Sequence, residues 1–201
     1  MATNKSYEVE EVVDPKAKEQ LLNELRGAID QVMADLQKKH PDADLSNYRK
    51  ILESVYLEGK PAKDTMGLGN EVIDALYAFG SNAYNTGNFV MSEAIFRHLL
   101  FMDSSQPRFG FALAASLHMQ KKYRKALEMY FMCLIYDSEN PLVFYHGADC
   151  CIHLNQIHAA DLLLQNTIDL AKDRPAYSHI VERSKMILEQ LIKEEKKLEN
   201  K

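Results

Sequence analysis

The sequence predicts an all-α protein, and three observations lead to that fold class. The 201 residues include only six Pro and eight Gly, fewer than the turns of an all-β protein usually need. The chain is 46% hydrophobic, which is enough for a core without disulfides or metal. Pro107, Pro141 and Pro175 lie 34 residues apart, and 34 is the period of the tetratricopeptide repeat, a helix–turn–helix unit. We therefore expect a solenoid of three such units.

The residues between the prolines match in the same register. The three units are 73–106, 107–140 and 141–174, and each has small side chains at its eighth and twentieth positions and larger apolar ones at its seventeenth and twenty-fourth. Small residues let two antiparallel helices approach closely, and large ones fill the space beside them. The matching residues are Gly80, Ala114 and Ala148; Phe89, Tyr123 and Ile157; Ser92, Ala126 and Ala160; and Phe96, Tyr130 and Leu164.

The repeats depart from the consensus at one position. The chain has no Trp, and the place of the consensus tryptophan in the three units is taken by Leu76, Gly110 and Phe144. Gly110 leaves a gap there, which we expect neighbouring phenylalanines to fill.

The chain before the repeats divides into a tail and two helices. We expect residues 1–15 to be disordered and 16–69 to form helices near 16–39 and 45–58, followed by a loop. These helices either cap the solenoid or mediate dimerisation, and both roles are compatible with the pattern. The residues assigned to dimerisation are Leu25, Ile29, Val32 and Leu36 of the first apolar stripe.

The repeat region itself covers residues 70–175. First helices are predicted near 71–85, 108–120 and 142–154, and second helices near 89–102, 123–136 and 157–172. Proline follows each second helix because it cannot continue that helix but fits the first turn of the next. Segment 176–201 has an apolar stripe and is predicted to be a capping helix, which a solenoid needs to cover its last repeat.

Composition excludes several partners and compartments. A net charge of −5 gives no basic footprint for nucleic acid or an anionic membrane. The longest stretch without Asp, Glu, Lys or Arg is 75–92, 18 residues that include several Ser, Asn and Thr, whereas a membrane span needs roughly 20 apolar residues. The N-terminus lacks the features of a secretory signal, and three Cys make a poor disulfide framework. The expected location is a reducing cytoplasm, without membrane insertion.

Motifs of catalysis and cofactor binding are missing from the sequence. It has no phosphate-binding loop, HExxH or CxxC, so we expect a non-enzymatic protein without a cofactor. One cluster, His146, Asp149, Cys150 and His153, has helical spacing that a soft metal could use. The preferred interpretation is that its cysteines are small buried residues, as free cysteine commonly is, and that no metal site exists.

The first helices of such repeats line a concave surface. The inward positions of the three units are mainly aromatic and apolar, which suits an extended apolar peptide. Repeat proteins that grip a chaperone's C-terminal carboxylate use lysine and asparagine in the first unit and a lysine in the third. Here Tyr77, Ser81 and Leu142 stand at those places, so that clamp is absent.

Three runs carry a closer resemblance. LYAFGSNAYNTGNF (76–89), PRFGFALAASLHMQKKYRKALEMY (107–130) and ENPLVFYHGADCCIHLNQIHAADLLL (139–164) resemble the class II chaperones of bacterial type III secretion systems. The Arg108-Phe109 pair and the His-Gly-Ala-Asp-Cys run from His146 are close to family patterns. The first forty residues are longer than the usual family N-terminus.

The resemblance implies a cytoplasmic bacterial chaperone. Such chaperones bind the hydrophobic translocator proteins of the secretion system through an extended segment in the groove, and they often dimerise through N-terminal helices. The matching groove positions here are Tyr77, Ser81, Tyr84, Phe111, Ala115, His118 and Tyr145. The alternative function is a repeat scaffold that joins folded partners.

Overall fold

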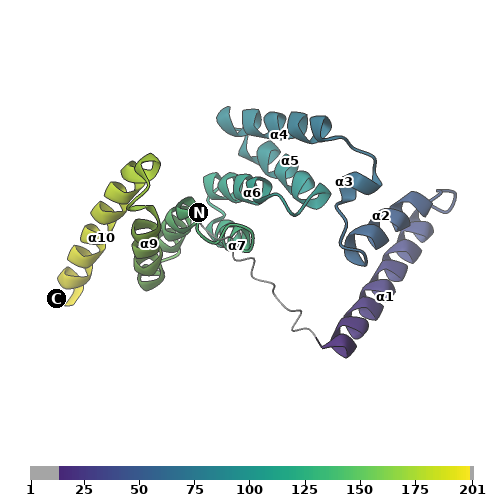
Figure 1. The fold of residues 1–201 in the computed structure, drawn as a ribbon, viewed down its shortest axis with the longest axis horizontal. Helices are drawn as coiled ribbons and strands as arrows, with labels where there is room; N and C mark the ends of the chain where they lie inside the picture. The colour runs from purple at the N-terminus through teal and green to yellow at the C-terminus, as the bar shows by residue number, and fades with distance from the viewer. Residues whose placement is uncertain (1–13, 200–201) are drawn as a thin grey trace, which may run out of the picture. The chain divides into compact units, whose positions relative to one another are not determined.

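The computed structural model describes the backbone of residues 14–199 and the side chains of residues 14–193. Within this part of the chain every regular element is a helix, as the sequence predicts. The chain divides into two compact units between Gly67 and Leu68 (Figure 1). The predicted disordered tail lies outside the described residues, except for Asp14 and Pro15, where the first helix begins.

The N-terminal unit contains helices α1 (Pro15–Lys39), α2 (Ser46–Tyr56) and α3 (Ala62–Thr65). The side chain of Asp14 accepts a hydrogen bond from the Lys16 backbone N–H and so caps α1. A small apolar cluster joins α1 to α2, and its buried members are Ile29, Met33 and Leu45.

Helix α3 lies where the sequence predicts only a loop. Ala62 at its start is fully buried, and the Thr65 hydroxyl donates to the Ser54 hydroxyl of α2 at 2.7 Å. These two tertiary contacts hold a helix of four residues that is too short to form by local preference.

The second unit contains three helix pairs followed by a last helix (Figure 1). The pairs are α4 (Asn70–Asn85) with α5 (Phe89–Met102), α6 (Pro107–Met119) with α7 (Tyr123–Cys133), and α8 (Pro141–His153) with α9 (Ile157–Ala171). A 3-10 turn (Pro175–Tyr177) leads to α10 (Ser178–Glu199), which packs against α9 and buries Ile180, Val181 and Leu191. Helix α7 ends three residues before the predicted boundary because residues 134–136 form a turn.

The turn inside each pair repeats one backbone conformation. Gly87, Lys121 and Asn155 occupy the fifteenth position of their units, with φ of 80°, 60° and 57°. This left-handed region costs glycine little, is tolerated by asparagine and strains lysine. The repeat therefore imposes its turn even on a residue that does not favour it.

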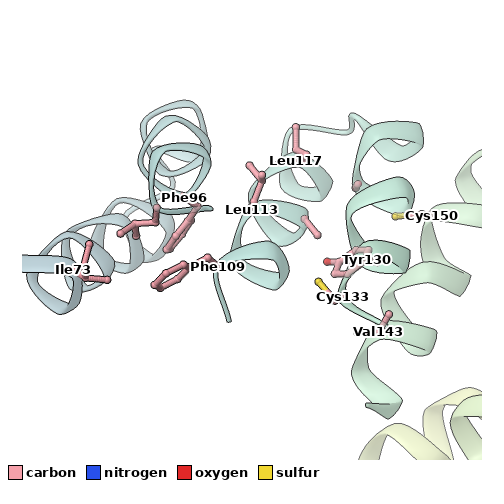
Figure 2. Close-up of a cluster of buried hydrophobic side chains, with 12 residues drawn as sticks. Ile73, Phe96, Phe109, Leu113, Leu117, Tyr130, Cys133, Val143 and Cys150 are labelled. Carbon is pink, nitrogen blue, oxygen red and sulfur yellow. The ribbon is translucent and has the colours of Figure 1, made fainter. Parts of the chain in front are cut away.

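Close helix contacts occur at the positions predicted from the repeat. Ala114, Ala126, Ala148 and Ala160 are completely buried, and a Cβ added to Gly80 would lie 3.0 Å from the side chains of Ile95 and Phe96. Figure 2 shows the core between successive pairs, with Phe96, Phe109 and Tyr130 among its large side chains. The prediction for Gly110 was wrong, since Cys133 Sγ, at 3.1 Å from an added Cβ, fills the space assigned to phenylalanines.

A carboxylate joins the first two pairs. Glu93 of α5 accepts hydrogen bonds from Lys122 Nζ and Gln120 Nε2, both at 2.8 Å, and from Arg97 at 2.7 Å. The hydrogen bond from Lys122, followed by those from Arg97 and Gln120, lowers the pKa of Glu93 to about 2. Charge-assisted hydrogen bonds of this kind stabilise the connection between α5 and the α6–α7 turn.

We expect Glu93→Gln to lower the free energy of unfolding by about 1–2 kcal/mol at pH 7. Because the folded pKa lies below the ordinary 4.5, the carboxylate stabilises the fold above that value and loses its effect as the pH falls towards about 2. Thermal unfolding of both proteins from pH 7 to pH 2 measures the difference, which should vanish at the acid end. Glu128→Gln, at an exposed position of α7, is the control, and a difference independent of pH would contradict the assignment.

Candidate binding groove

A cavity of about 500 Å³ opens along the first helices of the three pairs. All seven residues predicted for the groove line it: Tyr77, Ser81 and Tyr84 from α4, Phe111, Ala115 and His118 from α6, and Tyr145 from α8. Helical spacing explains their convergence, because residues three, four and seven apart share a face. The structure thus brings the seven predicted side chains into one cavity.

Five further lining residues were not predicted. Phe96 and Tyr130 reach the cavity from the second helices α5 and α7, Ala112 and His146 from α6 and α8, and Arg183 from α10. The repeat pattern places Phe96 and Tyr130 in the core, and both are indeed almost fully buried. They therefore form the bottom of the cavity as well as the core, a double role that the period alone does not reveal.

Aromatic contacts hold the walls of the groove. Tyr77 packs against Phe96 and Phe109, with ring centroids 5.5 and 5.9 Å apart. Phe111 meets Tyr130 edge-on at 5.5 Å, and Tyr84 meets Phe89 at 5.4 Å. Such edge contacts add stability beyond the burial of area, so the walls are preorganised.

Two pairs of polar side chains connect the first helices of neighbouring units. Arg108 of α6 donates to Asp74 of α4 at 2.7 Å, and its guanidinium lies 4.9 Å from the centre of the Tyr77 ring. His118 Nε2 of α6 lies 2.7 Å from Asp149 Oδ2 of α8. The hydrogen bond from His118 lowers the pKa of the Asp149 carboxyl, so this acid stays charged and paired.

The possible metal cluster does not converge. Cys150 is completely buried in the core, where burial raises the pKa of its thiol to about 12. His146 stacks on Tyr130, and His153 stacks on Tyr123 with 4.1 Å between ring centroids. Within the described residues, no three His, Cys, Asp or Glu side chains are grouped as metal ligands would be.

The four residues assigned to dimerisation differ in exposure. Ile29 is only 6% exposed and belongs to the core of its own unit, and Leu36 packs against that core. Leu25 is half-buried, whereas Val32 is 47% exposed. Only part of the stripe is therefore free to meet another chain.

Comparisons with known proteins agree with this fold. The Tetratricopeptide repeat family profile matches residues 110–140. The Low calcium response locus protein H of Yersinia pseudotuberculosis is 24% identical over 157 residues, which cover 78% of this chain and 93% of that protein.

Solved structures extend the agreement to three dimensions. PcrH of Pseudomonas aeruginosa, in complex with the chaperone binding region of PopD, is 26% identical with a TM-score of 0.62, covering 64% of this chain and 97% of that one. The Yersinia enterocolitica type III secretion translocator chaperone SycD, as an alternative dimer, shares the fold at 22% identity and a TM-score of 0.60, covering 62% and 95%. These findings confirm the repeat fold and the resemblance to class II chaperones.

One further property of the helices concerns membranes. Among the described residues, none of the helices combines the length and the apolar character that crossing a bilayer requires.

Proposed function

We propose that this chain is a chaperone of a bacterial type III secretion system that binds a hydrophobic translocator protein. An extended segment of the client lies in the groove, which keeps the client soluble and secretion-competent in the cytoplasm before export. The chaperone acts by binding alone, with no catalytic step and no cofactor. The observation that carries the proposal is the convergence of all seven predicted groove residues in one cavity, in a fold shared with PcrH bound to a region of PopD.

The lining suits a client that must later leave. Its surface is largely aromatic and apolar, and Asp149, one of its two charged residues, is already paired with His118. Apolar burial gives affinity without a new buried ion pair, whose geometry would have to be broken on release. A translocator carries membrane-seeking segments, so covering part of its chain prevents early association.

A general scaffold for folded partners is the second candidate. A folded partner would rest on an outer surface, whereas the concave cavity admits an extended segment. Co-expression with each translocator encoded by the same bacterium separates the two functions. The proposal expects one of them to move from the insoluble to the soluble fraction as a complex with this chain. If every translocator remains equally insoluble with and without it, the chaperone function is wrong.

We also propose that the chain forms a homodimer through the exposed part of α1. Val32→Asp places a charge at the centre of that face without entering the unit's core. Light scattering of the full chain should then show about half the mass of the wild type. Lys38→Asp, at an exposed position of the same helix outside the stripe, is the control. Equal masses for the wild type and Val32→Asp would leave these helices with a capping role.

A further inference from the structure

We infer that Tyr130 and His146 form a polar floor in the groove and hydrogen-bond the main chain of the bound client segment. The inference rests on the proposed function and deepens it, because it assigns how an extended segment is held in register. Both side chains line the cavity, one from α7 and the other from α8.

Tyr130 is a buried tyrosine whose hydroxyl does not help to hold the described part of the fold together. The residue is only 1% exposed, and its hydroxyl makes no hydrogen bond within the described part of the chain. Among residues 14–193 that are not exposed, Ser184 Oγ alone is both sealed from solvent and unpaired. The Tyr130 hydroxyl is therefore not sealed, and the residue faces the cavity. Burial raises the pKa of Tyr130, so the hydroxyl keeps its proton and can donate.

His146 is a neutral imidazole beside the Tyr130 ring. Its ring stacks on Tyr130 with centroids 5.6 Å apart and 13° between the planes, and Phe111 meets it edge-on at 5.8 Å. Burial, followed by the nearby His118, lowers the pKa of His146 to about 4. At neutral pH one ring nitrogen can therefore donate while the other accepts. Neither nitrogen has a hydrogen-bond partner in the described chain, in contrast to His118, which is occupied by Asp149.

The two groups match the needs of a bound peptide. An extended segment that enters an apolar groove brings a backbone N–H and C=O at every residue, and each buried group without a partner is costly. A phenol that donates and a neutral imidazole that donates or accepts satisfy these groups whatever the client's side chains are. The apolar walls then select side chains, while the floor fixes the position of the main chain.

The test begins with a probe that is shown to occupy the groove. Twelve-residue peptides are selected on the wild-type protein from a phage-displayed library, and one that loses binding to Phe111→Ala becomes the probe. If no peptide depends on Phe111, the proposed function itself is contradicted.

Tyr130→Phe removes only the hydroxyl and keeps the ring. We expect the dissociation constant of the probe, measured by calorimetry, to rise about tenfold. The thermal midpoint should stay unchanged, because the hydroxyl makes no hydrogen bond inside the fold. Tyr136→Phe, at an exposed tyrosine just after α7, is the matched control. A dissociation constant within twofold of the wild type overturns the inference while leaving groove binding intact.

Ester substitution of the probe tests the role of the main chain. Each amide of the peptide is replaced in turn by an ester, which removes the N–H donor and weakens the carbonyl acceptor. One ester should weaken binding to the wild type about tenfold and have no added effect on Tyr130→Phe or His146→Phe, since coupled partners are not additive. If every ester weakens binding to all three proteins equally, the floor does not hold the main chain.

Discussion

Replacing Phe109 by alanine is expected to lower the free energy of unfolding by about 3–5 kcal/mol. Phe109 is completely buried at the start of α6, in the core cluster that also contains Phe96 and Leu113 (Figure 2). Its ring also lies 5.9 Å from Tyr77 and 5.0 Å from the Arg108 guanidinium. Removing it leaves a cavity between the first two helix pairs that rigid helices cannot close.

This loss is large against a typical domain stability of about 5–15 kcal/mol. Urea denaturation followed by circular dichroism measures it as a lower midpoint with an unchanged slope. Phe79→Ala on α4 is the control, because this phenylalanine is exposed and its loss should change stability little. Equal midpoints for Phe109→Ala and the wild type would show that the contact between the first two pairs does not depend on this ring.

The 34-residue period of the sequence explains which parts of the fold could be predicted. Three prolines set the register, and small residues at fixed positions of each unit mark where helices touch, so the helix pairs follow from the sequence. Helix α3 and the filling of the space at Gly110 by Cys133 do not follow, because both depend on contacts between segments that no local pattern encodes. The left-handed backbone conformation of Lys121 could not be predicted either, because lysine has no preference for it.

The groove was predictable to the same extent and for the same reason. Inward positions of the first helices follow from the period, and the seven predicted residues line one cavity. Phe96 and Tyr130 were missed because a position that is nearly inaccessible to solvent looks the same in sequence whether it faces a core or the bottom of a groove. Arg183 was missed because it comes from α10, outside the repeats.

Client binding is expected to depend most strongly on two rings in the walls of this groove. Phe111→Ala and Tyr84→Ala should each raise the dissociation constant of a bound client segment by about thirtyfold, the effect of a central interface residue worth about 2 kcal/mol. Phe111 meets both Tyr130 and His146 edge-on, and Tyr84 meets Phe89 edge-on. Both side chains are only half-buried, so helix content by circular dichroism should change little.

The matched control is Phe131→Ala, at an exposed phenylalanine of α7 that does not line the cavity. Calorimetry with a segment of the translocator that co-expression makes soluble, chosen without reference to these variants, separates the three proteins, and unchanged affinity in both Phe111→Ala and Tyr84→Ala would contradict the groove assignment. Comparison with Tyr130→Phe then distinguishes two contributions. Loss of a wall ring removes apolar burial, so binding should weaken with a less negative heat-capacity change. Loss of the floor hydroxyl removes one hydrogen bond and should leave that heat-capacity change nearly intact.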